Sequence, residues 1–119
     1  MKFLLMMLAA TTVTLAGDKS ITGTWEVQTE IMGNENMTVC TLTQDSNKVT
    51  GKCTVNGADQ AVKGEITDQK VTFQHGGEYN GEALTIIYSG TFDSPTALTG
   101  EVNVQPFDVS GTFKAKKKE

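Results

Sequence analysis

Apolar and polar residues alternate over short stretches along most of the chain, with clusters of turn-forming residues between the stretches. Such alternation is typical of half-buried β-strands, and no stretch follows the period of an amphipathic helix. The pattern predicts eight strands, over residues 22–30, 36–44, 49–56, 60–67, 70–75, 82–92, 97–104 and 107–115. We therefore expect an all-β fold, an eight-stranded antiparallel up-and-down (meander) barrel, with an open sandwich as the alternative.

One short motif recurs six times within these strands: an apolar residue, a polar residue, glycine, any residue and a second apolar residue. Its glycines are Gly23, Gly51, Gly64, Gly90, Gly100 and Gly111. Because strand side chains alternate between faces, each glycine lies on the same face as the apolar residues and is expected to point inward. Inward glycines let strands bend and let rings approach the backbone; the candidate rings are Trp25, Phe92, Phe107 and Phe113.

The turns between the strands allow the register of each hairpin to be predicted, because opposed residues are equidistant from the centre of the turn. A turn centred between Gly57 and Ala58 places Gly51 opposite Gly64. Turns centred on Pro95 and between Gln105 and Pro106 place Gly100 opposite both Gly90 and Gly111. Three adjacent strands would then share a row of inward glycines.

The two cysteines are predicted to face each other across one hairpin. A turn centred between Ser46 and Asn47 makes Cys40 and Cys53 direct cross-strand neighbours. Directly opposed residues can be close enough for a disulfide, and no Cys-x-x-Cys motif indicates redox chemistry. We expect a structural disulfide between Cys40 and Cys53.

The first residues have the pattern of a secretory signal peptide. Lys2 is followed by an apolar run over residues 3–10 and by a small-residue stretch that ends at Ala16. We expect a signal peptide over residues 1–16, a single barrel domain over residues 17–119, and a secreted or periplasmic location; the alternative is a hydrophobic first strand. The run is too short to span a bilayer, so no stable membrane anchor is expected.

The formal net charge of −4 argues against a nucleic-acid partner, because binding to phosphates depends on positive charge. The basic residues at the C-terminus, Lys114, Lys116, Lys117 and Lys118, are expected to form a solvated, frayed end. Asn36 begins a glycosylation sequon, which matters only in a eukaryotic secretory pathway.

The segment from Ile21 to Trp25, with its Gly-x-Trp, resembles the first strand of the avidin family and, more broadly, the calycin-like barrels, which include lipocalins and fatty-acid-binding proteins. That resemblance implies a ligand held inside the barrel. Most of the remaining chain is similar to short secreted bacterial domains of unassigned function, through Leu42, Gln44, Asp45, Gly51, Tyr88, Gly90, Gly111, Phe113 and Ala115. This second likeness implies the fold and export, and it implies no site residues.

Little catalytic chemistry is available. His75 is the only histidine, which excludes multi-histidine metal sites, and we expect neither a cofactor nor a metal. It begins the segment from His75 to Gly81, where a general acid–base pair with Glu78 is conceivable, although no activated nucleophile accompanies it. We favour a plain loop with His75 on the inner face, placed where a lid over a ligand would lie.

The inner face of the barrel is therefore the candidate site. The predicted ligand-binding residues are Trp25, Phe73, His75, Tyr79, Ile86, Tyr88 and Phe107. The first hypothesis is a non-enzymatic module that binds a small apolar or amphipathic, hydrophobic ligand in the barrel mouth. The second is a filled barrel that binds a protein through outward apolar residues, Met37, Val39 and Ile87. An enzyme that uses His75, Glu78 and Tyr79 is the third, and we expect no catalytic residues.

Overall fold

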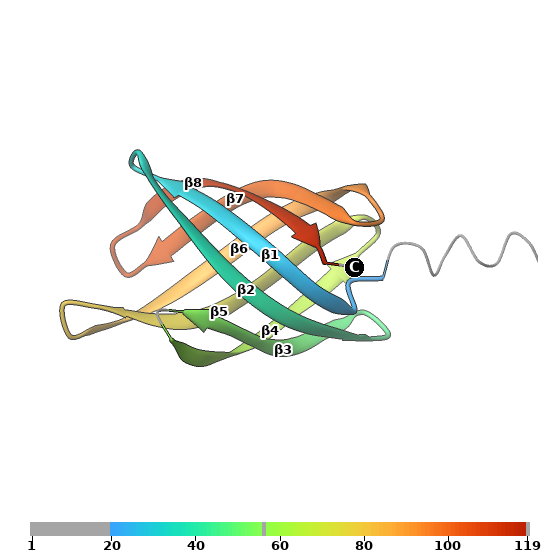
Figure 1. Ribbon diagram of the computed structural model, residues 1–119, viewed down its shortest axis with the longest axis horizontal. Coiled ribbons are helices and arrows are strands. Elements are labelled where there is room, and N and C mark those ends of the chain that lie inside the picture. Colours follow the sequence, from blue (N-terminus) through green and yellow to red (C-terminus); the bar gives the residue numbers. More distant parts are fainter. Residues whose placement is uncertain (1–19, 56, 119) are drawn as a thin grey trace, which may run out of the picture.

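The computed structural model describes residues 20–55 and 57–118, which form one closed antiparallel barrel (Figure 1). Its strands are β1 (Gly23–Ile31), β2 (Asn34–Asp45), β3 (Lys48–Val55), β4 (Ala58–Thr67), β5 (Lys70–Tyr79), β6 (Glu82–Ser94), β7 (Ala97–Gln105) and β8 (Val109–Lys117). Each strand pairs with the next, and β8 pairs with β1 to close the ring. The prediction of an eight-stranded meander barrel is confirmed. The expected signal peptide lies outside the described residues.

The strand β5 is longer than the sequence pattern indicates. The predicted strand ends at residue 75, whereas β5 continues to Tyr79. Its two glycines pair with β6, Gly76 opposite Thr85 and Gly77 opposite Leu84. Since a backbone ladder needs no side chain, this glycine pair extends the hairpin where the pattern indicated a loop. The expected flexible loop and lid at this position are therefore wrong.

The barrel has two different ends, which lie left and right in Figure 1. The turns between β1 and β2, β5 and β6, and β7 and β8 lie at one end, which we call the mouth. The opposite end contains the turns between β2 and β3, β4 and β5, and β6 and β7, together with the last residues of β8. We call it the closed end, because the chain preceding β1 covers it.

The closed end is sealed by apolar side chains and by paired polar groups. Ile21 and Trp25 are completely buried there. The indole N–H of Trp25 donates to the carbonyl oxygen of Ile21 at 2.8 Å, and the backbone N–H of Ile21 donates to Oε1 of Gln44 at 3.0 Å. Lys117 donates from Nζ to the carbonyl of Ser20 at 2.9 Å and lies over the Trp25 ring. These bonds satisfy the polar groups that burial of Trp25 removes from water.

The C-terminal lysines are part of this structure rather than a frayed end. Lys114 and Lys116 are solvent-exposed, as expected, but they lie within β8, where they pair with Gln28 and Glu26 of β1. The expectation of fraying was wrong because the pairing between β8 and β1 closes the barrel and extends to Lys117.

The predicted hairpin registers are correct in two cases. Cys40 lies opposite Cys53, and the two form a disulfide as predicted. Both are completely buried, so the bond lies inside the barrel wall. Gly90 lies opposite Gly100, which also agrees with the prediction.

The predicted pairing of Gly51 with Gly64, and the predicted row of Gly90, Gly100 and Gly111 on three adjacent strands, are wrong. Gly51 lies opposite Val62, because the β3–β4 turn closes with Val55 opposite Ala58, one step earlier than assumed. Gly100 lies opposite Phe113 and not Gly111, because Val104 pairs with Val109 and the β7–β8 turn is centred later than assumed. Gly90 and Gly100 are therefore opposed, whereas Gly51 and Gly111 are offset from the glycines of the neighbouring strands.

The offset of Gly111 places Phe113 opposite Gly100, which explains how this aromatic ring fits against the wall. A Cβ added at Gly90 would lie 2.8 Å from Cζ of Phe113, and one added at Gly100 would overlap the backbone of β6. These inward glycines therefore let adjacent strands bend close together and let the Phe113 ring lie against them. The glycines face inward as predicted, and Phe113 is the predicted ring found over them.

The seam between β4 and β5 is the shortest in the barrel wall. Residues 63–67 of β4 pair with residues 70–74 of β5, and the ladder then stops, although both strands continue to the mouth. A side chain bridges part of this gap: Oε1 of Gln60 lies 3.1 Å from where a Cβ at Gly76 would be. The mouth half of this seam thus lacks backbone pairing.

The outward apolar residues do not form one patch. Met37 and Val39 are exposed on β2, and Ile87 is half-buried on β6. Three strands separate β2 from β6 in either direction around the closed barrel. In residues 20–55 and 57–118, no helix is long and apolar enough to cross a membrane.

Candidate functional site: the barrel mouth

A cavity of about 190 Å³ opens inside the mouth. Strands β1, β2, β5 and β6 supply most of its wall, because their inward positions near the β1–β2 and β5–β6 turns face the same space. The lining residues are Thr29, Ile31, Asn36, Met37, Thr38, Val55, His75, Gly77, Glu78, Tyr79, Leu84, Ile86 and Tyr88. This cavity is the candidate site.

The cavity is continuous in its lining with a wider apolar recess at the rim, of about 500 Å³, which also takes in β7 and β8. Three large apolar side chains stand exposed around this recess: Met32 (79% exposed), Tyr79 (60%) and Phe107 (46%). They lie at the ends of three different hairpins, and the rings of Tyr79 and Phe107 meet edge to face at 6.3 Å. The mouth therefore presents an apolar rim to solvent.

Met32 occupies a backbone conformation that suits other residues better. Its φ is 53°, in the left-handed region where glycine, asparagine and aspartate are favoured. The residues with positive φ in the other tight turns are all polar: Ser46, Asp68 and Asn80. A methionine placed there is unfavourable for the backbone and keeps an apolar side chain at the mouth, and such outliers concentrate at functional sites.

The buried polar residues of the described chain are Thr29, Thr38 and His75, and all three line the cavity. The apolar core extends from the closed end up to this level. Above it, the inward positions are mixed: Asn36 is polar, whereas Ile31 and Ile86 are apolar. The floor of the cavity is therefore the one place inside the described barrel where polar side chains are buried.

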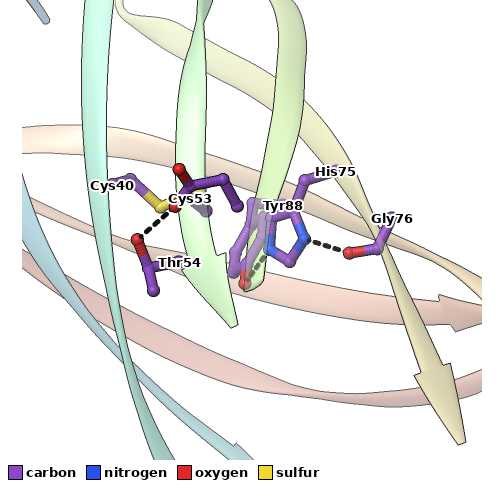
Figure 2. The surroundings of a disulfide bond; sticks show 7 residues. Cys40, Cys53, Thr54, His75, Gly76 and Tyr88 are labelled. Carbon is purple, nitrogen blue, oxygen red and sulfur yellow. Dashed lines mark hydrogen bonds between the residues drawn. A yellow bond between two sulfur atoms is a disulfide. The ribbon is translucent and has the colours of Figure 1, made fainter. Parts of the chain in front are cut away.

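His75 and Tyr88 form a hydrogen-bonded pair at this floor, shown in Figure 2. The distance between Nε2 of His75 and the Tyr88 hydroxyl oxygen is 2.9 Å, and Nδ1 of His75 lies 2.7 Å from the carbonyl oxygen of Gly76. Since a carbonyl oxygen only accepts, Nδ1 must hold the proton and donate it. In the neutral imidazole, Nε2 then accepts the Tyr88 O–H.

Burial acts on the ionisation of both side chains. It lowers the pKa of His75 below its ordinary value of 6.5, while the bond to the Gly76 carbonyl acts in the opposite direction. Burial also raises the pKa of Tyr88. Both shifts favour the neutral forms, because a low-dielectric environment penalises charge. At neutral pH the pair is uncharged.

The ring of Tyr88 is held in a fixed position. It stacks on Phe73, with ring centroids 4.6 Å apart and planes 13° apart, and the edge of Phe113 meets it at 5.2 Å. Offset-stacked and edge-to-face contacts of this kind are the preferred aromatic geometries. The Tyr88 hydroxyl is therefore fixed next to His75, which lies nearer to the mouth than Phe73 on β5.

A second recess, of about 320 Å³, lies on the seam between β4 and β5. Its lining includes Val62 and Lys63 on β4 and Gln74, His75 and Gly76 on β5. His75 therefore borders both the mouth cavity and the seam. The missing backbone pairing between β4 and β5 leaves this side of the histidine without a neighbouring ladder.

Five of the seven predicted ligand-binding residues lie at the mouth: His75, Tyr79, Ile86, Tyr88 and Phe107. Phe107 is at the rim and half exposed, and not over the inward glycines as expected. The structure places the other two elsewhere. Trp25 is sealed into the closed end, and Phe73 lies beneath Tyr88 in the core. These two residues lie away from the mouth because shared parity specifies a face and not a height along the barrel.

The sequence reasoning missed Thr29, Thr38 and Met32. Thr29 continues the inward alternation of Trp25 and Val27, so the parity of β1 already placed it inside. Its polarity marks the level at which the core ends, which could have indicated the open end. For Met32 the signal was a Met-Gly pair in a position where hairpins prefer Asn-Gly.

The lining of the cavity is almost free of charged side chains. Glu78 is the only lining residue that carries a formal charge at neutral pH. Among residues 20–55 and 57–118 there is no group of three or more His, Cys, Asp and Glu side chains that could hold a metal ion. The polar chemistry on offer is thus that of the His75–Tyr88 pair, the two threonines and Asn36.

The comparisons with known proteins identify the fold. No protein-family model matches the sequence, and no curated protein matches it. The structure is similar to the redesigned β-barrel b11L5F_LGL (TM-score 0.64, 17% identity, 83% of this chain and 92% of that chain). It is also similar to mFAP1, a redesigned β-barrel bound to DFHBI (0.58, 15%, 82% and 94%), and to EF1p2_mFAP2b bound to DFHBI (0.58, 13%, 86% and 98%). At these identities the likeness shows the barrel fold alone.

Proposed function

We propose that this protein is an exported, non-enzymatic binding module that holds a small apolar or amphipathic ligand in the mouth of its barrel. The observation that carries the proposal is the apolar rim of Met32, Tyr79 and Phe107 above a cavity with buried polar residues at its floor. An apolar recess with a few convergent polar groups is the usual form of a small-molecule site.

Three further observations support it. Met32 is exposed in a backbone conformation that disfavours methionine, so the rim keeps this residue at a cost in stability. The disulfide between Cys40 and Cys53 is consistent with an oxidising compartment. Two barrels of the same fold are bound to the small molecule DFHBI, so the architecture is compatible with small-ligand binding.

Binding can be tested with N-phenyl-1-naphthylamine, a neutral apolar dye whose fluorescence rises when it leaves water. We expect saturable binding that is weakened about tenfold by Phe107→Ser, because the ligand then loses one to two kcal/mol of apolar burial. Val39→Ser is the matched control, since Val39 is an exposed apolar residue of β2 that does not line the mouth.

The location of the dye is checked by backbone amide shifts in NMR. We expect them to move at residues 29–38, 75–86 and 104–109 and to stay unchanged at the closed end. Absence of saturable binding, or equal weakening by Phe107→Ser and Val39→Ser, would contradict the proposal. Native mass spectrometry of the protein purified from its own host would then reveal whether a natural ligand is retained.

The alternative is a protein-interaction domain, and the exposed Met37 and Val39 on β2 favour it. Both hypotheses predict that a bound molecule covers apolar surface, the mouth in the first case and the outer face of β2 in the second. A partner whose contact moves the amide shifts of residues 39–43 of β2 and leaves those of residues 75–86 and 104–109 unchanged would support the alternative.

A further inference from the structure

The hydrogen-bond polarity at the cavity floor specifies what kind of ligand group can bind there. The Gly76 carbonyl fixes the proton of neutral His75 on Nδ1. Nε2 is therefore an acceptor, and it takes the single hydroxyl proton of Tyr88. The Tyr88 oxygen then has only lone pairs left to offer the cavity.

This arrangement cannot easily reverse at neutral pH. A reversal would require a second proton on His75, which is buried, and the Tyr88 ring is held between Phe73 and Phe113. The ionisable groups around the histidine are Lys63 of β4, which shares its seam, Tyr88 of β6, and Glu78 and Tyr79 of β5, which share its cavity. Neither Lys63 nor Glu78 is bonded to the imidazole.

The remaining cavity chemistry disfavours anions. Glu78 is negative, and no lysine or arginine lines the cavity or the rim recess. A buried carboxylate would meet no counter-charge and no donor from the pair; the threonine hydroxyls and the Asn36 amide would be its only neutral donors, so most of its desolvation would be uncompensated. A hydroxyl group, in contrast, can donate to the Tyr88 oxygen.

We propose that the mouth selects amphipathic ligands whose buried end is a neutral hydrogen-bond donor, a hydroxyl that donates to the Tyr88 oxygen, and that it discriminates against carboxylates. This inference rests on the proposed function and adds the chemical class of the ligand. The apolar body of such a ligand lies in the rim recess among Met32, Tyr79 and Phe107.

Three ligands with the same apolar body test the proposal: 4-propylphenol, its methyl ether 4-propylanisole, and 4-propylbenzoate. Each competes with N-phenyl-1-naphthylamine at neutral pH. We expect the phenol to bind about tenfold more tightly than the ether, the difference for one hydrogen bond, and the benzoate to bind most weakly. Equal binding of phenol and ether, or tightest binding of the benzoate, would overturn the proposal.

A matched pair of variants assigns the selectivity to the acceptors of the floor. Because Tyr88→Phe alone would expose Nε2 of His75 as a new acceptor, it is combined with His75→Leu; the double variant keeps the stacked ring and removes both acceptors, so the phenol-to-ether affinity ratio is expected to fall to about one. Thr41→Val removes a hydroxyl from the outer face of β2, away from the mouth, and is expected to leave the ratio at about ten. A ratio that survives in the double variant would show that the floor does not select the donor.

Protonation of His75 should change the phenol-to-ether affinity ratio, which a purely steric role of the residue would leave unchanged. Once NMR shows the imidazole to be doubly protonated, Nε2–H donates to Tyr88 and the tyrosine O–H is free to donate into the cavity. The ether should then gain relative to the phenol by several fold. An unchanged ratio in the protonated protein would contradict the assigned hydrogen-bond polarity. Failure of the dye and all three ligands to bind would instead contradict the proposed function itself.

Discussion

The two ends of the barrel are built from the same eight strands, yet they differ in which polar and apolar side chains are buried and which are exposed. At the closed end, Ile21 and Trp25 are buried and their polar groups bond to the chain itself. At the mouth, Met32 is exposed while His75 is buried beside a cavity. At the closed end the buried polar groups are hydrogen-bonded within the chain, whereas the mouth contains a cavity with an apolar rim.

The difference teaches that strand alternation alone does not determine which end is open. Inward positions alternate along every strand, but a covering segment precedes β1 at one end only. The residues Ser20–Thr22 bring a carbonyl to Lys117 and a backbone N–H to Gln44. No equivalent bonds link the described turns at the mouth across its opening, so the cavity there stays accessible.

The strongest test of the closed end is Trp25→Ala. We expect a loss of about 3–5 kcal/mol in the free energy of unfolding, because a completely buried aromatic side chain leaves a cavity. Denaturant unfolding measures it. Phe107→Ala at the mouth removes a large ring of similar chemistry and should cost under about 1 kcal/mol, since that ring is half exposed. Equal losses would show that the two ends contribute alike.

Removing the disulfide probes the wall between the two ends. We expect replacement of Cys40 and Cys53 together by alanine to lower stability by about 3 kcal/mol, through freedom gained by the unfolded chain. Because the bond lies below the mouth, dye affinity in the folded variant should stay within about twofold of the original. A loss of binding without a loss of stability would mean that the bond shapes the cavity.

Acidification should destabilise the mouth through His75. Its folded-state pKa is lowered below 6.5, so the unfolded chain takes up a proton first as the pH falls. The stability is thus complete above pH 6.5 and declines as the pH drops through the lowered pKa. The melting temperature, measured from pH 7.5 downward, should fall less in His75→Gln than in the original protein. Parallel curves would remove His75 as the cause.

The smallest expected effect is a gain in folding stability from a substitution at the mouth. Met32→Asn suits the left-handed backbone and should raise stability by about 0.5–1 kcal/mol while weakening dye binding. Asp68→Asn, in a tight turn at the closed end with a similar φ of 58°, is the control and should change neither quantity. A more stable Met32→Asn protein with unchanged affinity would show that Met32 has no role in binding.

The fold was largely predictable from the sequence because alternation and turn residues are local signals. They gave the strand number, the inward glycines and the Cys40–Cys53 pair. Registers could be predicted only where the centre of the turn was identified correctly. The β7–β8 turn is centred one residue later than predicted, and Gly100 therefore does not lie opposite Gly111. The site was predictable in part: His75, Tyr88 and Ile86 follow from parity, but the height of Trp25 does not. Height depends on hydrogen bonds between distant segments, such as that from Ile21 to Gln44.

The incomplete ladder between β4 and β5 has a consequence for how the molecule fluctuates. Amide hydrogens of residues 58–62 and 75–79 that face this seam lack a cross-strand acceptor, so they should exchange with solvent faster than those of the fully paired β5–β6 hairpin. Transient opening would begin there, next to Gln60 and Gly76. The wall would then part beside His75, which would give a bulky guest a second, lateral route to the cavity besides the open mouth.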